Sequence, residues 1–473
     1  MHMERIYRFR NIKALLEGKP KDGYFSELEK QSIYFAVPSE LNDPVEGLRS
    51  IHWIGDKIIW KNFIRNYALT LTNAVIGRDL LGDELKYHHE LLDMFLMPSN
   101  IPSPEYKDLF DKIETQVMRS RHVRFVLDVI TIEQRRIRKN ELLFHLDNIH
   151  LVILRIIHQE LSKAIPDIFD YRAKSPRLSY RDLIKKYTSI IEEVKKQKDD
   201  EREQFIDDIL VSYEHFITGK QLTIGFYDSN RNIHDRFFVI EFSKVYVEKL
   251  QELIFPPWAT ACFVSDCENS AMWGHYAASH QGCCLIFQPD NKSINLYNVP
   301  GTSPRGISFK LYKIDYDNGA GDIDFFKSMG RLPITTIADN WMNESNGTTS
   351  KFLEYYSRHD GKGFQETYWS NFYRDITRKT SDWRYEQEFR LIQNGNFVDI
   401  TRPETRLYNY DFTSLKGIIF GIKTRSEDKV KIIKLLQEKC KINGVEDFEF
   451  RQSYYCKKTN KIKNYKLDFA LDY

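Results

Sequence analysis

Cysteine is scarce in this sequence of 473 residues, which contains only six. So few cysteines do not supply the disulfide scaffold that is typical of small secreted proteins. Two of them, Cys283 and Cys284, are adjacent. A few neighbouring thiols in a chain of this size favour a reducing compartment. The cysteine content therefore predicts free thiols in a cytoplasmic protein.

Long apolar runs and an excess of charge are also absent. The 69 basic and 67 acidic residues leave a net charge of +2, so there is no bulk attraction to nucleic acid or membranes. No apolar run approaches the roughly 20 residues of a membrane-spanning helix. The charged residues Glu4 and Arg5 lie where a secretion signal would have an apolar core. We therefore expect no membrane contact, and any nucleic-acid contact must come from a local patch.

Glycine-rich nucleotide motifs are a third absence. Neither a phosphate loop nor a dinucleotide-binding fingerprint is present, which argues against P-loop and Rossmann chemistry. No internal repeat is present either. A chain of this length predicts one core domain with a second domain or a large insertion.

Strand patterns occur near both ends of the chain. Short apolar or alternating runs bounded by turn residues predict strands at Arg5–Phe9, Ser32–Ala36, Cys283–Phe287, Gly306–Ile314, Phe389–Ile392, Gly417–Gly421 and Phe448–Tyr455. Helices are predicted at Asn11–Glu17 and Glu427–Lys439.

Helical spacing dominates the middle of the chain. Apolar residues there are three and four apart, as in Ile206, Ile209 and Leu210. The sequence therefore predicts an α+β fold with a mixed or antiparallel sheet core, formed by residues 1–55 and 254–473. A large helical insertion, residues 56–253, would interrupt this core.

The segment Arg384–Ile392 has the residue types for chemistry. If it is a strand, side chains alternate, so that Glu386 and Glu388 share one face with Arg384 and Arg390. Two carboxylates at this spacing can hold a cationic intermediate and a ribose hydroxyl, or can share a proton because their charges repel. The alternative is a solvent-exposed face on which the arginines pair with the glutamates.

A second candidate segment, Ser270–Gln281, has the length of a helix, a capping residue at its start and Gly282 after its end. Helical spacing puts Trp273 and Tyr276 on one face and His275 on the adjoining one. The two aromatic side chains can instead pack in the core. His275 can act as an acid, a base or a stacking partner, or can be a buried histidine with satisfied hydrogen bonds.

Cysteines and histidines between Cys262 and Cys284 invite comparison with a zinc site. Zinc ligands typically occur in pairs two to four residues apart, and the gaps here are wider. Cys283 and Cys284 would also point to opposite faces of a strand. We therefore expect no metal.

Four groups of residues together resemble the bacterial family catalogued as domain of unknown function 2971. They are Tyr7–Arg10; Tyr34–Pro38 with Asn42-Asp43-Pro44-Val45-Glu46; Met272–Tyr276 with His280-Gln281-Gly282; and Trp383–Arg390. The resemblance covers both ends of the chain and omits most of residues 56–253. The family name itself implies no activity.

The order of these groups is similar to that in proteins with the ADP-ribosyltransferase fold. Such proteins carry an Arg or His on an early strand, then a serine or aromatic motif, then a late strand with a catalytic Glu two residues after a Glu or Gln. Arg8, Tyr34 to Ser39, and the pair Glu386 and Glu388 follow this order. The segment Val37-Pro38-Ser39 departs from the usual Ser-Thr-Ser.

This second resemblance implies NAD as the cofactor. Arg8 would bind the cofactor phosphates, Glu388 would stabilise the oxocarbenium-like transition state, and Glu386 would position an acceptor. His275 would be a further catalytic residue. The other expected cofactor contacts are Tyr34, Ser39, Asn42, Asp43, Trp273 and Tyr276. For the turn at Asn42 and Asp43, a purely structural role is the alternative.

Three functions stay open at this point. The leading hypothesis is an intracellular bacterial effector, an ADP-ribosyltransferase-like enzyme that uses NAD in toxin activity or phage defence. The second is a non-catalytic interaction or sensor module of a defence or stress system, in which the motif residues form a buried polar network. The third is a hydrolase that uses His275 and a glutamate. Convergence of Arg8, Glu388 and His275 on one open cleft would favour the enzymes.

Two basic stretches, Arg119–Lys139 and Lys457–Lys466, are candidates for contact with nucleic acid. Aromatic residues interleave with lysines in the tail from Tyr454 to Lys466, as in grooves that bind single strands. The alternatives are a solvent-exposed helical face for the first stretch and a hairpin with a lysine-rich turn for the second. The target, whether protein or nucleic acid, is not identified by these residues.

Overall fold

The computed structural model describes residues 5–17, 26–43, 50–81, 88–131, 135–166, 180–227, 237–297, 306–318, 322–357, 362–396 and 398–468. The chain divides into two compact units. Unit 1 comprises Met1–Arg49, Pro256–Gly321 and Asn371–Tyr473, and unit 2 comprises Ser50–Phe255 and Asp322–Ser370. The predicted α+β fold class is confirmed. Unit 2 contains the segment predicted as a helical insertion and also residues 322–370, which the sequence assigned to the core.

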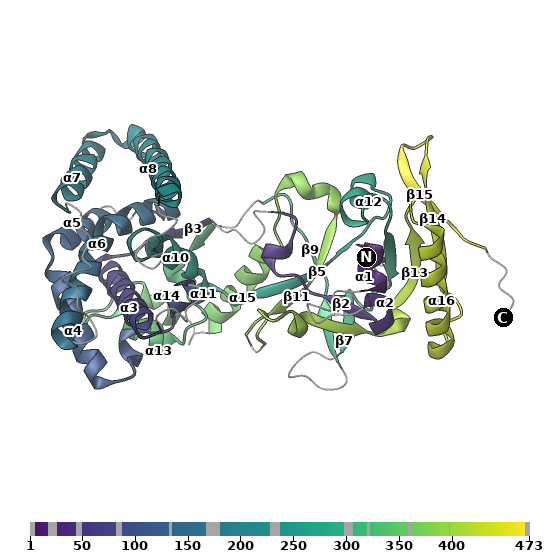
Figure 1. Ribbon diagram of the computed structural model, residues 1–473, viewed down its shortest axis with the longest axis horizontal. Coiled ribbons are helices and arrows are strands. Elements are labelled where there is room, and N and C mark those ends of the chain that lie inside the picture. The colour runs from purple at the N-terminus through teal and green to yellow at the C-terminus, as the bar shows by residue number, and fades with distance from the viewer. Residues whose placement is uncertain are drawn as a thin grey trace. The chain divides into compact units, whose positions relative to one another are not determined.

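Unit 1 is built on a mixed eight-stranded sheet with the order β15-β14-β13-β6-β1-β5-β11-β9 (Figure 1). Neighbouring strands are antiparallel except β13 and β14, which are parallel. The strands are β1 (Ile6–Arg10), β5 (Trp258–Val264), β6 (Cys283–Phe287), β9 (Tyr312–Lys313), β11 (Glu388–Asn394), β13 (Leu415–Phe420), β14 (Glu449–Cys456) and β15 (Lys461–Lys466).

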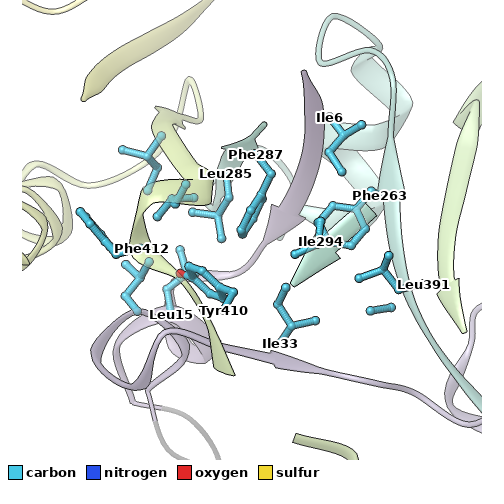
Figure 2. Close-up of a cluster of buried hydrophobic side chains, with 14 of the residues drawn as sticks. Ile6, Leu15, Ile33, Phe263, Leu285, Phe287, Ile294, Leu391, Tyr410 and Phe412 are labelled. Carbon is cyan, nitrogen blue, oxygen red and sulfur yellow. The ribbon is translucent and has the colours of Figure 1, made fainter. Parts of the chain in front are cut away.

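A second, four-stranded sheet in unit 1 has the order β2-β12-β7-β8. Side chains of both sheets meet in one core, and Figure 2 shows Tyr410 of the smaller sheet beside Phe287 of the larger one. These two rings pack edge to face, with their centroids 5.1 Å apart. The strands are β2 (Ser32–Tyr34), β7 (Ser293–Tyr297), β8 (Ile307–Lys310) and β12 (Leu407–Tyr410).

Short helices connect the strands of unit 1, and one longer helix, α16 (Ser426–Asn443), packs Ile432 and Leu436 into the same core. The others are α1 (Ile12–Leu16), α2 (Glu27–Lys30), α12 (Ser270–Tyr276), η2 (Pro38–Glu40), η11 (Ser381–Glu386), η12 (Pro403–Arg406) and η13 (Phe412–Ser414).

Strand β6 is buried on both faces, as its continuous apolar run predicts. Cys283, Leu285 and Phe287 point into the core between the sheets. Cys284 and Ile286 point into a second apolar cluster, which includes Trp273 of α12. The two-residue period of a strand produces this division.

Strands β1 and β5 separate within the large sheet. Tyr7 pairs with Val264, and this is the single β1–β5 pair in the described part of the sheet. Farther along β5, Thr260 exchanges both backbone hydrogen bonds with Ala36 instead. Antiparallel neighbours normally exchange hydrogen bonds along their shared length. The gap therefore leaves backbone carbonyl groups of this edge available to side chains.

The helix predicted over Ser270–Gln281 is shorter than expected and ends at Tyr276. Ala278, Ser279 and His280 follow with positive φ angles of 47°, 56° and 68°. This left-handed turn is closed by hydrogen bonds such as that from the Gly282 amide to the Ala277 carbonyl. The helix has to end there because β6 begins at Cys283, which pairs with Arg10 of β1.

The strand predicted from Arg384 also begins later than expected, at Glu388. The preceding residues form η11, and Gln387 has a left-handed φ of 47°. Alternation therefore holds for Glu388 and Arg390 but not for Glu386 and Arg384, and Arg384 pairs with Asp317 instead. A strand pattern does not reveal a left-handed residue at its own start.

Unit 2 is mostly helical, with one small sheet of order β10-β3-β4. Its core is rich in aromatic rings, such as Trp60 against Phe326 at 5.3 Å. No helix among the described residues is long and apolar enough to cross a membrane. The principal elements of the unit are β3 (Ser50–Trp53), α3 (Lys57–Leu81), α4 (Pro104–Arg119), α5 (Arg121–Thr131), β4 (Ile137–Arg138), α6 (Lys139–Ala164), α7 (Tyr180–Lys196), α8 (Asp199–Tyr227), α10 (Phe242–Lys249), α11 (Gln251–Ile254), β10 (Asp322–Asp324), α13 (Ile334–Ile337) and α14 (Leu353–Ser357); α15 (Lys362–Ile376) continues into unit 1.

Candidate functional site

A cavity of about 310 Å³ lies in unit 1 at the gap between β1 and β5. We call it the unit 1 cavity. Its volume lies near the lower end of the range for small-molecule sites, about 300–1,000 Å³. It is lined by Tyr7, Arg8, Phe9, Arg10, Asn11, Tyr34, Ala36, Glu40, Leu41, Asn42, Thr260, Cys262, Val264, Met272, His275, Tyr276, Lys379, Glu386, Glu388 and Arg390.

Most of the residues singled out in the sequence border this cavity, namely Arg8, Tyr34, Asn42, His275, Tyr276, Glu386 and Glu388. Three others do not line it. Ser39 is exposed, and Asp43 is buried. Trp273 lies in the second apolar cluster, where its indole N–H donates to the Cys267 carbonyl at 2.8 Å. The motif residues Pro44, Val45 and Glu46 lie outside the described residues.

Arg8 gives the cavity a buried positive charge, since it is only 7% exposed. Its two terminal nitrogens donate to the carbonyl oxygens of Cys262 and Tyr34, both at 3.2 Å. Its Nε is buried and has no hydrogen-bond partner among the described residues. These carbonyls are available because β1 and β5 separate here. The Arg8 guanidinium thus bonds carbonyls that the backbone amides of a neighbouring strand would bond in a regular sheet.

Arg8 also has no carboxylate partner within ion-pair distance in the described part of the chain. The ring of Phe263 lies 5.4 Å from the guanidinium and partly compensates its charge. Burial and the nearby Arg10 lower the pKa of Arg8 to about 10, so the group is still charged at neutral pH. A buried charge without a counter-ion is costly, and a bound anion would remove that cost.

Glu388 belongs to a buried ion-pair network. Arg390 donates to its Oε1 at 2.7 Å and to its Oε2 at 3.1 Å, and Lys379 donates to Oε2 at 3.3 Å. Burial acts to raise the pKa of Glu388, but Arg390 and Lys379 outweigh it and lower the pKa to about 2. Arg390 therefore pairs with this glutamate, but the expected solvent-exposed face is wrong, because Glu388 and Arg390 are buried and Arg384 pairs with Asp317.

Glu386 has a different environment from Glu388. The hydroxyl of Tyr276 donates to its Oε1 at 2.5 Å, and Lys379 donates to its Oε2 at 2.7 Å. Burial raises the pKa of Glu386 above its ordinary value despite the charge of Lys379. Burial and the charge of Glu386 likewise raise the pKa of Tyr276. A carboxylate with a raised pKa beside a phenol can take up or release a proton at the cavity wall.

Lys379 is the central residue that the sequence did not reveal. Its Nζ bonds both glutamates and lies 4.7 Å from the centre of the Trp383 ring. Burial acts to lower the pKa of Lys379, but Glu388 and Glu386 outweigh it and raise the pKa. Lys379 precedes η11, so neither helical spacing nor strand alternation connects it with the glutamates.

The remaining polar groups of the cavity are less reactive or more exposed. His275 is exposed, and its Nδ1 lies 3.2 Å from the Tyr385 hydroxyl. Burial and the charge of Glu388 raise the pKa of the Cys262 thiol, so it is neutral and a poor nucleophile. No group of three or more His, Cys, Asp or Glu residues in the described ranges is arranged to hold a metal ion.

Comparison with known families gives one match. The sequence profile of the family described as Protein of unknown function (DUF2971) matches residues 272–391, which supports the resemblance to that family. The matched segment runs from α12 to β11 and thus includes Tyr276, Lys379, Glu386, Glu388 and Arg390 of the cavity. No curated protein and no solved structure matches the chain.

Proposed function

We propose that unit 1 is an ADP-ribosyltransferase-like enzyme that binds NAD in the unit 1 cavity. The observation that carries the proposal is Arg8, whose buried guanidinium has neither a carboxylate partner nor a hydrogen-bond acceptor at Nε among the described residues. A phosphate group of the cofactor would supply a negative charge for the guanidinium and a hydrogen-bond acceptor for Nε. NAD carries an ADP-ribosyl group, and its ribose develops positive charge as the glycosidic bond to nicotinamide breaks. Carboxylates that line the same cavity could stabilise this positive charge.

Glu386 is the carboxylate that we propose to act on the substrate, together with Tyr276. The family resemblance would give this role to Glu388, but both oxygens of Glu388 are occupied by Arg390 and Lys379. A fixed carboxylate stabilises developing positive charge without reorganisation. Glu388 would then be a positioning residue, because it holds the Lys379 ammonium that also bonds Glu386.

Binding of NAD tests the role of Arg8. Titration calorimetry of Arg8→Gln should show roughly tenfold to hundredfold weaker binding, the usual loss for one charge-assisted contact. Arg451→Gln is the control, since Arg451 is paired with Glu449 and neither residue lines the cavity. The proposal fails if the wild type does not bind NAD, or if both variants lose the same affinity while remaining folded.

Turnover tests the role of Glu386. Release of nicotinamide from labelled NAD, with and without cell extract, should fall about a hundredfold in Glu386→Gln while the affinity for NAD is kept. Toxicity on expression in cells is the parallel readout for an effector of toxin activity or phage defence. Unchanged turnover per folded molecule would rule out this assignment.

A non-catalytic interaction or sensor module is the second candidate, and the closed network of Lys379, Glu388 and Arg390 favours it. In that case Glu386→Gln would change the stability of the protein, and neither the wild type nor the variant would turn over NAD. The hydrolase alternative with His275 has less support, because the imidazole of His275 bonds Tyr385 rather than a glutamate.

Nucleic-acid contact through Lys457–Lys466 is a further part of the proposal. Tyr454, Tyr455 and Tyr465 of the β14–β15 hairpin are exposed beside its lysines, as a stacking surface requires. The stretch Arg119–Lys139 is less suitable because arginines such as Arg135 and Arg138 are paired with carboxylates. Residues 132–134 of that stretch lie outside the described residues.

A further inference from the structure

Unit 2 contains a cavity of about 510 Å³ between α3, α4 and α5, which we call the α3 cavity. Lys57, Lys61 and Arg65 line it from α3, and their spacing of four residues places them on one face of that helix. Met118 of α4 and Leu127 of α5 give the wall an apolar part. A cavity of this volume can hold a small molecule.

Both lysines of this face are already paired with carboxylates of the same lining. Lys57 donates to Asp128 at 2.8 Å, and Lys61 donates to Glu344 at 2.5 Å. Each pair is neutral as a whole, so it attracts an ion of either sign only weakly. Arg124 also borders the cavity, but it is exposed, and solvent screens its charge. These five residues therefore do not decide which charge a ligand carries.

Arg65 and Glu114 are the other two charged residues of the lining, and both are half-buried. Arg65 donates to the backbone carbonyls of Asp339 and Asn340, at 3.4 and 3.2 Å. Its Nε is buried and has no hydrogen-bond partner among the described residues. Glu114 has neither a hydrogen bond nor an ion pair in the described part of the chain. Within the same ranges, both groups therefore lack a counter-charge in direct contact.

The charges of Arg65 and Glu114 nevertheless interact across a short distance. Burial raises the pKa of Glu114, and the charge of Arg65 opposes this rise. Burial likewise lowers the pKa of Arg65, and the charge of Glu114 opposes that change. Half-buried charges without a contacting partner are costly, so a ligand that supplies one counter-charge to each group gains affinity at both. Such a ligand has a carboxylate and an ammonium group close together.

We infer that the α3 cavity binds an α-amino acid with an aliphatic side chain. Its carboxylate binds the Arg65 guanidinium, and its ammonium group binds the Glu114 carboxylate. One carbon atom separates the two charges of an α-amino acid, which suits two protein charges that interact without contact. The aliphatic side chain lies against Met118 and Leu127. This inference does not depend on the function proposed for unit 1.

The test uses the full chain, with L-leucine, L-valine and L-methionine as probes in titration calorimetry. Each probe is compared with the carboxylic acid that lacks its amino group and with the amine that lacks its carboxyl group. At least one amino acid should bind roughly tenfold more tightly than both of its matched compounds, because each of these leaves one protein charge without a partner. Equal affinities within every set would overturn the inference, as would the absence of saturable binding by all three amino acids at about 10 mM.

Glu114→Gln locates the ammonium group of the ligand. The variant should bind the amino acid roughly tenfold to hundredfold more weakly. Its thermal midpoint should not fall, because Glu114 has no hydrogen bond or ion pair to lose within the described ranges. Asp108→Asn is the matched control on the same helix, since Asp108 is exposed and outside the lining. Wild-type affinity in Glu114→Gln, or an equal loss in Asp108→Asn, would contradict the inference.

Arg65→Lys tests the carboxylate of the ligand. The change keeps the positive charge but removes the guanidinium fork that matches a carboxylate, so binding should weaken by about tenfold. Near-ultraviolet circular dichroism checks that the variant is folded. Wild-type affinity in the folded variant would contradict the proposed role of Arg65.

Discussion

The arginines buried in unit 1 differ mainly in their partners. Arg390 is fully buried and bonded to Glu388, and Arg406 is bonded to Glu40. Within the described ranges, Arg8 donates to two backbone carbonyls only. All three arginines are thus buried, and the absence of a carboxylate within ion-pair distance among the described residues distinguishes Arg8. That difference separates a charge that stabilises the fold from one that can bind a ligand.

Glu388→Gln should mainly destabilise the protein. The change leaves Arg390 buried without its anionic partner and removes one of the two carboxylates that bond Lys379. Breaking a buried pair typically costs about 3–5 kcal/mol. We expect a loss of that size in the free energy of unfolding at pH 7, measured by chemical denaturation. Glu404→Gln is the control, since Glu404 is exposed and paired with Arg402 on the surface. A stable Glu388→Gln protein with strongly reduced turnover would instead support a catalytic Glu388.

The stability that Glu388 contributes should depend on pH in the acid range. Its pKa is lowered from 4.5 to about 2 in the folded protein. A lowered carboxyl pKa stabilises the fold above the pKa of the unfolded chain, and this stabilisation is lost as pH falls through the folded pKa. The difference in unfolding free energy between wild type and Glu388→Gln should therefore shrink from about pH 4.5 towards pH 2. A constant difference over this range would contradict the ion-pair network.

Residue identities alone led to much of the candidate site. Arg8, Glu386 and Glu388 were found because their types and order resemble a known arrangement, and all three border one cavity. Lys379 was not found, because its link to Glu386 passes through η11 and follows no regular period. Trp273 was misleading, since its spacing suits both a core and a binding face, and its side chain packs in the second apolar cluster.

The junction between α12 and β6 shows how one element limits another. Helical signals in the sequence extend to Gln281, but pairing of Cys283 with Arg10 fixes where β6 starts. The chain must therefore leave the helix after Tyr276 and turn through three residues with positive φ. Local propensity could not show this, because the pairing partner is far away in the sequence.

Gly282→Ala should be strongly destabilising at this junction. An added Cβ would lie 2.3 Å from the Arg10 carbonyl oxygen, and that backbone is fixed by pairing in β1. We expect a clear drop in the thermal midpoint. The control is Gly274→Ala on α12, where a Cβ would meet nothing within 4 Å. Replacing a helical glycine there should stabilise the protein by about 0.5–1 kcal/mol. Similar midpoints for the two variants would contradict the close approach at Gly282.

At the scale of the whole chain, the sequence indicated a helical insertion but not its full extent. Residues 322–370 belong to unit 2, and Phe326 packs against Trp60 and Phe63 of α3. Such contacts join segments that are more than 200 positions apart, so no local pattern reveals them. The α+β class and strands such as β1, β6 and β13 could be predicted because they depend on local periodicity, whereas strands such as β5 and β12 were not predicted.

Removal of residues 56–253 alone should therefore give an aggregating protein. The deletion would remove aromatic partners of Phe326 and Trp341, which are buried in unit 2. Exposed aromatic clusters of this kind promote association. We expect little soluble monomer by size-exclusion chromatography. A stable monomer would show that residues 322–370 do not need the rest of unit 2.

The large sheet of unit 1 depends on its C-terminal hairpin, which is formed by β14 and β15. β14 pairs with β13 over Gly417–Phe420, and Phe448 and Phe450 contribute to the core between the sheets. A chain that ends at Asp447 would expose the edge of β13 together with this part of the core. An exposed apolar edge strand is prone to intermolecular pairing, so the truncated protein should be insoluble. A chain that ends at Asp468 keeps β14 and β15 and should remain soluble with an unchanged thermal midpoint. Equal solubility of the two truncated chains would mean that the eight-stranded sheet does not depend on its C-terminal strands.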